Sequence, residues 1–308
     1  MYTDYDVIVL GAGAAGLSAA IYTSRAGWDT AVFEKKSFGG EAVNRQLLEN
    51  YPGFANGIMG PELAAALTEQ AENGGAELEI AEVDSIRDKG SHKVVTLDGG
   101  GRRVTCKGII VATGSHPRLL EVPGEAELTG HGVFYCATCD GPACAGKPVV
   151  VSGGGSSAFT EALHLEKLGC HVTIVCRSTP RAEQVLRRRV EENPNIDVLC
   201  NTDIVKIDGD DWVKGVQLRD KTRYDEWTVY VIGVYVRIGQ IPNTEFLKDT
   251  ITLTPAGQIP VGPNMSTSMA GVYAAGDIRT DSPMQMSTAA GDGAAAAIAL
   301  GHYLHTLG

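Results

Sequence analysis

An internal repeat constrains the fold more than any other feature of this 308-residue sequence. The first copy begins with DVIVL (6–10) and GAGAAG (11–16), and the second begins with KPVVVS (147–152) and GGGSSA (153–158). Each copy continues with a helical segment and a second strand-like run. Glycines between a strand and a helix permit a tight turn, and the helix N-terminus can then hold a dinucleotide pyrophosphate. The repeat therefore predicts an α/β protein with two Rossmann-like dinucleotide-binding domains.

The two copies differ where their second strands end. Glu34 ends this strand in the first copy, where an acid accepts hydrogen bonds from a ribose hydroxyl. The equivalent position in the second copy is Cys176, which is followed by Arg177 and Arg181. An acid would repel a 2'-phosphate there, whereas an arginine can bind one. We interpret the second copy as a site for NADP rather than NAD, with a solvated arginine pair as the alternative.

A third segment indicates that the first domain is discontinuous. GVYAAGD (271–277) leads into an alanine-rich helical pattern, a strand-to-helix arrangement that again faces a ligand with a helix N-terminus. ATG (112–114) follows another strand, and Pro117 and Pro242 suit short linkers. The second domain is therefore predicted to be inserted in the first. The predicted domains are residues 1–116 with 242–308, and residues 117–241.

Composition and charge exclude several classes of protein. A chain with 44% hydrophobic and 20% charged residues is typical of soluble globular proteins. A net charge of -11 lacks the basic surface that nucleic acid requires, so no nucleic-acid partner is expected. No apolar run approaches the ~20 residues that span a bilayer, and the first six residues are polar, so no membrane partner is expected. Seven cysteines in a chain of this size suit a reducing compartment, and we predict a cytoplasmic protein.

The sequence CATCD (136–140) raises three possibilities for its two thiols. Tetrahedral zinc takes four nitrogen or sulfur ligands, and the chain has no second CxxC, which disfavours a metal site. A static structural bridge is a second possibility. A redox-active dithiol of Cys136 and Cys139 is the third, and Asp140 is then placed to move a proton or to cap a helix.

These motifs together resemble the low-molecular-weight thioredoxin reductases over essentially the whole chain. The motifs that carry the resemblance occur in the family's order: GAGAAG, ENYPGF (49–54), ATG, CATCDG, GGGSSA, IGQIPNT (238–244), AAGD and TAAGDGA (288–294). The resemblance implies an FAD domain split across the chain, an inserted pyridine-nucleotide domain with a redox dithiol, and a homodimer.

The resemblance also implies an activity and a distribution of site residues. Electrons from NADPH would pass through FAD to Cys139, and Cys136 would then attack the disulfide of thioredoxin or a thioredoxin-like protein. Asp140 would act as general acid. FAD would be bound by Gly11, Gly13, Ala14, Ala15, Gly16, Glu34, Lys35, Gly40, Glu41, Asn50, Val83, Ala112, Thr113, Gly114, Asp277, Gln285, Met286 and Ser287. The pyridine nucleotide would be bound by Gly153, Gly155, Ser156, Ser157, Arg177 and Arg181.

Four positions depart from the family pattern. Glu41 stands where the family usually has glutamine, Ser156 where it has aspartate, and Cys176 and Met284 where it has arginine. Loss of one bidentate phosphate contact costs roughly 1.5 to 3 kcal/mol. One alternative is therefore an NADPH-independent thioredoxin reductase that takes electrons from reduced ferredoxin. Another is a non-catalytic flavoprotein whose dithiol senses redox state.

Two further groups of residues carry expectations. The basic run 187–189 lies in a predicted helix, where it could steer a partner protein or form a solvated face. Cys106, Cys170 and Cys200 lie in or beside apolar stretches and are predicted to be small core residues.

Overall fold

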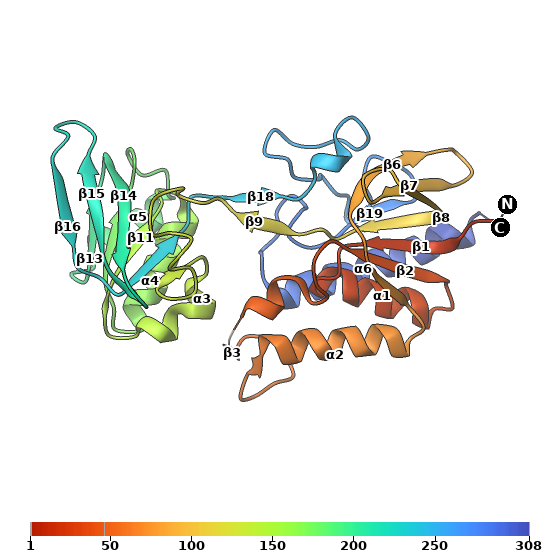
Figure 1. The fold of residues 1–308 in the computed structure, drawn as a ribbon, viewed down its shortest axis with the longest axis horizontal. Helices are drawn as coiled ribbons and strands as arrows, with labels where there is room; N and C mark the ends of the chain where they lie inside the picture. The colour runs from red at the N-terminus through yellow and green to blue at the C-terminus, as the bar shows by residue number, and fades with distance from the viewer. Residues whose placement is uncertain (1, 46, 308) are drawn as a thin grey trace. The chain divides into compact units, whose positions relative to one another are not determined.

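The chain folds into two compact units, each built around a parallel sheet. The computed structural model describes residues 2–45 and 47–307. Unit 1 comprises Met1–His116 and Ile241–Gly308, and unit 2 comprises Pro117–Gln240 (Figure 1). Each unit contains one copy of the strand, glycine turn and helix repeat. The predicted α/β class with two Rossmann-like parts is therefore confirmed.

The sheet of unit 1 has the strand order β5-β2-β1-β8-β7-β6, and β19 pairs with β8. The parallel strands are β1 (Tyr5–Leu10), β2 (Thr30–Glu34), β5 (Glu77–Ile80), β8 (Arg102–Val111) and β19 (Val272–Ala274). β6 (Val83–Asp88) and β7 (Lys93–Leu97) complete it in antiparallel register. Residues 7–10 of β1 are all buried, as expected for a parallel strand covered on both faces.

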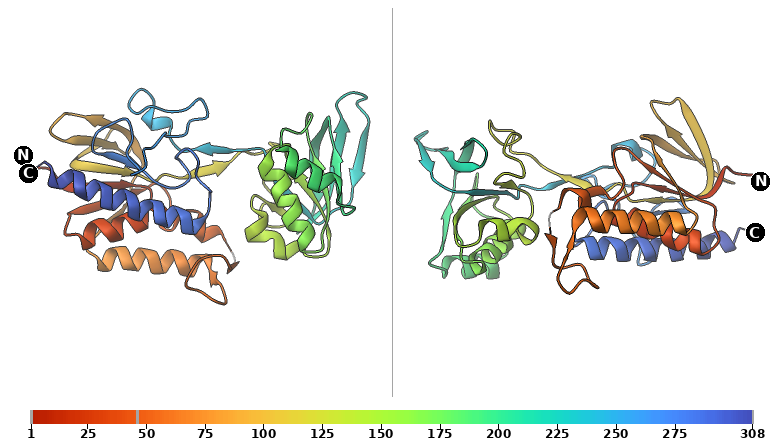
Figure 2. Two further views of the ribbon diagram at one scale, coloured as in Figure 1. Left: turned by 180° about the vertical axis from the view of Figure 1, so that it is seen from behind. Right: turned by 60° about the horizontal axis from the view of Figure 1, so that its bottom comes forward.

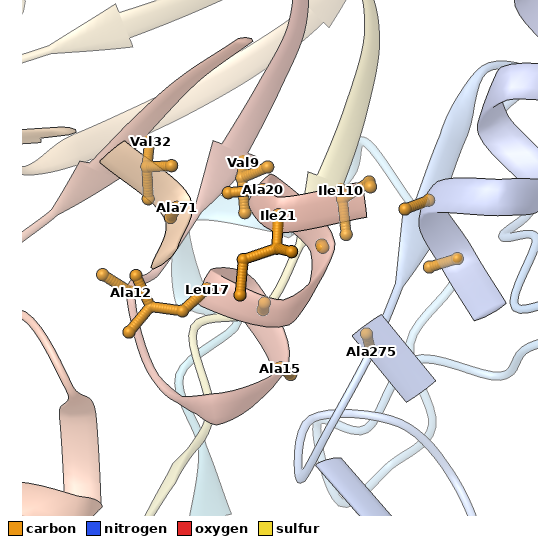
Figure 3. Close-up of a cluster of buried hydrophobic side chains, with 14 of the residues drawn as sticks. Val9, Ala12, Ala15, Leu17, Ala20, Ile21, Val32, Ala71, Ile110 and Ala275 are labelled. Carbon is orange, nitrogen blue, oxygen red and sulfur yellow. The ribbon is translucent and has the colours of Figure 1, made fainter. Parts of the chain in front are cut away.

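Three helices cover one face of this sheet. α1 (Ala14–Arg25), α2 (Gly60–Asn73) and α6 (Met286–His305) lie together on that face (Figure 2). Val9, Val32 and Ile110 point from the strands toward Leu17 and Ile21 of α1, and all five are buried (Figure 3). Alternate strand residues face the other side, where the β6-β7 hairpin and the 3-10 turn η3 (Glu245–Leu247) pack. The short elements η1 (Gly40–Asn44), β3 (Leu47–Leu48) and β4 (Ile58–Met59) precede α2.

The sheet of unit 2 has the strand order β10-β17-β11-β12-β13, and every pair is parallel. Its strands are β10 (Val133–Phe134), β11 (Pro148–Ser152), β12 (His171–Val175), β13 (Ile196–Leu199) and β17 (Gly233–Val236). One face packs against α3 (Ala137–Asp140), η2 (Gly141–Cys144), α4 (Ser156–Lys167) and α5 (Gln184–Glu191). The other face packs against the antiparallel sheet of β14 (Thr202–Gly209), β15 (Val213–Asp220) and β16 (Glu226–Val229).

The two chain crossings between the units are β9 (Ser115–Pro117) and β18 (Gln240–Pro242), which pair as a two-stranded sheet. Both prolines singled out as linker residues lie in these strands. Within the described ranges 2–45 and 47–307, no helix is both long enough and apolar enough to cross a membrane.

Burial corrects one expectation about the cysteines. Cys106 and Cys170 are buried, as predicted, and so are Cys144 and Cys176. Cys200, however, is exposed, so its prediction as a core residue is wrong. Cys200 lies just beyond the last paired residue of β13, which is the edge strand of its sheet.

Candidate active site

The two sulfurs of the CATCD motif are paired with each other. Cys136 and Cys139 form a disulfide with their Cα atoms 5.4 Å apart. Cys136 caps the short helix α3, and its Sγ accepts a hydrogen bond of 3.3 Å from the Cys139 amide. Asp140 ends the helix but makes no side-chain cap to the following 3-10 turn. Across residues 2–45 and 47–307, no group of three or more His, Cys, Asp or Glu is arranged to hold a metal ion.

The dithiol turn, which we define as residues 135–140, is held at both ends by residues from distant parts of unit 2. Arg237 Nη1 donates a 2.9 Å hydrogen bond to the carbonyl oxygen of Tyr135, directly before Cys136. The Tyr235 hydroxyl donates a 3.2 Å hydrogen bond to the carbonyl oxygen of Asp140. Sequence reasoning found neither contact, because the partners are 102 and 95 positions apart and share no motif.

Glu125 is a buried residue that hydrogen-bonds to the first residue of the dithiol turn. It is 3% exposed, and its carboxylate accepts backbone hydrogen bonds from Leu120 and Glu121 at 3.0 and 2.7 Å. It also accepts the Tyr135 hydroxyl at 3.1 Å. Burial, with the nearby Glu125 charge, raises the pKa of Tyr135 to about 12, so the hydroxyl remains protonated and continues to donate. Tyr135, which had no predicted role, therefore fixes the backbone that enters Cys136.

The glycines of the first repeat form a cradle whose geometry fits a bound pyrophosphate. Gly11 has φ +96°, and a Cβ there would lie 2.5 Å from the carbonyl oxygen of Ala112. A Cβ on Gly16 would lie 1.8 Å from the oxygen of Gly11. Gly13 differs, because its φ is -78° and the nearest atom to a Cβ is 3.9 Å away, on Gly40. The protein itself does not require glycine at position 13, but close approach of a pyrophosphate does.

The other residues predicted to bind FAD gather at the carboxyl edge of the unit 1 sheet. Glu34 ends β2, and its carboxylate accepts the amides of Ala12 at 2.8 Å and Lys36 at 3.0 Å. Asn50 Nδ2 donates a 3.1 Å hydrogen bond to Gln285 Oε1, which joins two predicted residues from opposite ends of the chain. The remaining predicted residues lie after β1 (Ala14, Ala15), after β2 (Lys35), in η1 (Gly40, Glu41), at the start of β6 (Val83), after β8 (Ala112, Thr113, Gly114), after β19 (Asp277) and at the start of α6 (Met286, Ser287).

Asp277 lies in an electrostatically unfavourable setting. Burial is the largest cause that raises the pKa of its carboxyl group. A hydrogen bond of 3.2 Å from the Ser282 hydroxyl opposes this rise, whereas the charge of Glu41 adds to it. Glu41, the position where the family usually has glutamine, also forms an ion pair with Arg45 at 3.5 Å. The carboxylate at position 41 therefore adds a negative charge that raises the pKa of Asp277.

A buried ion pair holds the loop that carries Asp277. Arg279 donates to both carboxylate oxygens of Asp292, from Nε at 2.6 Å and from Nη2 at 2.9 Å. The Gly276 amide also donates to Asp292, at 3.2 Å. Because Asp292 belongs to α6, this pair ties the loop after β19 to the helix that begins at Met286.

We expect Asp292→Asn to lower the free energy of unfolding by about 3 kcal/mol, because Arg279 would remain charged and mostly buried without its anion. Urea denaturation followed by circular dichroism measures this change. The matched control is Asp210→Asn, which removes an exposed ion pair with Lys214 and should cause no measurable change. Equal losses of stability in the two variants would contradict the role given to Asp292.

The second glycine-rich turn is built in the same way, in unit 2. Gly153 has φ +149°, and a Cβ there would lie 2.4 Å from the carbonyl oxygen of Arg237. Gly155 has φ -94°, and a Cβ would meet nothing within 4 Å. Ser156 and Ser157 begin α4, directly after this open position. The space at Gly155, like that at Gly13, is the space that a pyrophosphate needs.

The segment after β12 folds back onto this turn. The Arg181 amide donates to the Gly154 oxygen at 2.7 Å, and the Glu183 amide donates to Ser156 Oγ at 3.1 Å. Arg177 and Arg181, both in the segment after β12, are exposed. Lys221, which sequence reasoning missed, adds a third cation, because its Nζ donates to the Arg177 carbonyl oxygen at 3.1 Å.

Comparison with known proteins identifies relatives along the whole chain. The family model described as pyridine nucleotide-disulphide oxidoreductase matches residues 5–293. A thioredoxin reductase from Treponema pallidum (strain Nichols) is 42% identical over 100% of this chain and 99% of its own length. A bifunctional thioredoxin reductase/thioredoxin from Mycobacterium leprae (strain TN) is 43% identical over 96% of this chain, but only 65% of that longer protein is covered.

A solved structure shows the same architecture. The crystal structure of thioredoxin reductase from Streptococcus pyogenes MGAS5005 matches with a TM-score of 0.88 and 35% sequence identity. The match covers 98% of each chain. The resemblance drawn from the motifs is therefore confirmed at the level of the family.

Proposed function

The chain belongs to the pyridine nucleotide-disulphide oxidoreductase family as a flavin-dependent disulfide oxidoreductase of the thioredoxin reductase group, and from this premise we propose the roles of its residues. Cys136 and Cys139 reduce the disulfide of thioredoxin or a thioredoxin-like protein. The observation that carries this proposal is the Cys136–Cys139 disulfide, held at both ends in the unit that contains the second glycine-rich turn.

The two glycine-rich turns receive separate dinucleotides in this proposal. Gly13 would admit the pyrophosphate of FAD, and Glu34 would accept hydrogen bonds from its ribose. FAD, when bound, supplies a carrier that takes two electrons from a nicotinamide and passes them to a disulfide. Gly155 would admit the pyrophosphate of NADPH, with Arg177 and Arg181 at its 2'-phosphate.

Thiol–disulfide exchange with the substrate uses the neighbouring thiols of Cys136 and Cys139 in turn. In the reduced protein the Cys136 thiolate attacks one sulfur of the substrate disulfide, which forms a mixed disulfide and releases the first substrate thiolate. The Cys139 thiolate then attacks Cys136 Sγ, which restores the Cys136–Cys139 disulfide and releases the second. The released thiolates take up the two protons that the Cys136 and Cys139 thiols lost on ionisation, one from water and one delivered by Asp140 as general acid.

Neither the ferredoxin-dependent enzyme nor the non-catalytic redox sensor is favoured. The comparisons lend no support to an NADPH-independent enzyme that uses reduced ferredoxin. A non-catalytic redox sensor is also not proposed, because the relatives are named as reductases. Thioredoxin is the proposed protein partner, and a homodimer and a cytoplasmic location remain proposals that rest on the resemblance and on cysteine usage.

Anaerobic mixing with NADPH tests the proposed donor. We expect NADPH to bleach the oxidised flavin band rapidly, and NADH to require about ten- to a hundredfold higher concentration because it lacks the 2'-phosphate. Stopped-flow absorbance measures both reactions. Subsequent addition of oxidised thioredoxin should restore the band. A flavin that stays oxidised in NADPH would refute the donor, and a reduced flavin that thioredoxin cannot reoxidise would refute the substrate.

A further inference from the structure

Arg237 connects two parts of unit 2 that the proposed function uses. It directly follows β17, and its guanidinium donates from Nη1 to the carbonyl oxygen of Tyr135 at 2.9 Å. Its Nε lies 3.1 Å from Oε1 of Glu161 on α4. The two side chains are mostly buried, with exposed fractions of 18% and 12%. Arg237 therefore lies in a water-poor position between the dithiol turn and the helix that begins at Ser156.

The backbone of Arg237 is fixed as firmly as its side chain. Its amide donates to the carbonyl oxygen of Ser152 at 2.8 Å. Its own carbonyl oxygen packs against Gly153 so closely that a Cβ there would be 2.4 Å away. The guanidinium therefore extends toward Tyr135 from a rigid base, which is the condition for precise positioning of a neighbouring group.

The Arg237 guanidinium is a positive charge in contact with the chain that enters Cys136. The carbonyl carbon of Tyr135 is bonded to the Cys136 nitrogen, so the contact is made at the peptide group next to the cysteine. A cation close to a thiol stabilises the thiolate, and the effect is stronger where water is scarce. Glu161 holds the cation in place and partly offsets its charge.

We propose that Arg237 is a positioning residue for the dithiol: held by Glu161, it fixes the peptide group before Cys136 and supplies the positive charge that favours the Cys136 thiolate. The inference deepens the proposed function and rests on it, because it matters for turnover only where Cys136 is the attacking nucleophile.

Other charged and titratable groups also surround the dithiol turn. Asp140 and Cys139 lie in α3, Glu125 lies behind Tyr135, the Tyr235 hydroxyl contacts the Asp140 carbonyl, and His164 of α4 has its Nε2 3.9 Å from a Cβ placed on Gly141. These groups remain unchanged in variants of Arg237 and Glu161. Differences between those variants therefore report the ion pair itself.

The test measures the acidity of Cys136 in variants of each partner. In a Cys139→Ser background, the rate of iodoacetamide alkylation of Cys136 is followed against pH, and the modified peptide is identified by mass spectrometry. Arg237→Met should raise the Cys136 pKa by on the order of one pH unit, because the cation is lost and Glu161 remains. Glu161→Gln should lower it, because the cation remains without its counter-charge.

The opposite signs distinguish a charge effect from a packing effect. If Arg237 and Glu161 acted only as packing, both variants would shift the Cys136 pKa in the same direction or not at all, and either result overturns the inference. Arg237→Lys should stay close to the parent pKa, because it keeps the charge. Arg219→Met, which breaks an exposed pair with Glu226 in the same unit, is the control and should cause no shift.

The design also separates this inference from the proposed function. Turnover that survives Cys136→Ser would refute the function itself. Loss of turnover in Cys136→Ser, together with same-direction shifts in the two charge variants, would refute only the role of Arg237. If Arg237→Met fails to fold, the near-isosteric Glu161→Gln decides alone, and an unchanged or raised Cys136 pKa in that variant overturns the inference.

Discussion

Serine at Cys136 or at Cys139 should lower thioredoxin-reducing turnover by more than about a thousandfold, because the exchange needs both an attacking and a resolving sulfur. Reduction of thioredoxin, followed by insulin precipitation, measures this loss. Flavin bleaching by NADPH should persist in both variants, because neither cysteine belongs to the proposed nucleotide sites. Both variants should therefore accept electrons from NADPH but fail to pass them to thioredoxin.

The two serine variants should differ in one product. Cys139→Ser keeps the attacking thiol, so after chemical reduction it should form a stable mixed disulfide with thioredoxin that lacks a resolving sulfur. Cys136→Ser should form none under the same conditions. The matched control is Cys200→Ser, which changes an exposed thiol in the same unit and should leave turnover unchanged. Turnover that survives in either dithiol variant, or a trapped complex only in Cys136→Ser, would contradict the assigned order of attack.

Gly13→Ala should give a folded protein that does not retain FAD. The nearest atom to the new Cβ is 3.9 Å away and φ is -78°, so the fold tolerates the methyl group. The methyl group would nevertheless occupy the space where the pyrophosphate approaches the backbone. The ratio of flavin to protein absorbance measures retention of FAD, and far-ultraviolet circular dichroism checks the fold.

Gly155→Ala is the crossed control, because it makes the same change in the second turn. A Cβ at Gly155 meets nothing within 4 Å, so this variant should fold and keep FAD while its affinity for NADPH falls by at least about tenfold. Gly11→Ala should behave differently from both, because φ of +96° and a 2.5 Å contact with Ala112 oppose any side chain and should destabilise unit 1. A Gly13→Ala protein that purifies with full FAD would contradict the proposal that the FAD pyrophosphate approaches the backbone at Gly13.

The agreement between sequence and structure is closest where the signal is local. The helical segment predicted after GAGAAG is α1, which begins at Ala14 and ends at Arg25. The basic run 187–189 lies within α5, as its predicted helix required. Strand, glycine turn and helix are contiguous, so the backbone conformations they demand can be read from neighbouring residues.

The errors and omissions concern contacts between distant residues. Cys200 was predicted to be buried from its apolar neighbours, but its burial depended on whether another strand lay beyond β13. Arg237, Tyr235 and Glu125 have no motif that points to the dithiol. The contacts of Arg237 and Tyr235 depend on the parallel pairing of β10 and β17, which brings the ends of these strands together. Glu125 instead reaches Tyr135 from ten positions earlier in the chain.

The sequence by itself determined that this protein has two strand, glycine turn and helix repeats and one CxxC pair of cysteines. Each of these is a local pattern of small residues or thiols whose geometry is set within a few positions. Only the tertiary structure decided which charges surround Cys136 and which glycines face open space. Those properties depend on side chains up to 102 positions apart that meet in a water-poor interior, where the strength of a charge is set by its neighbours.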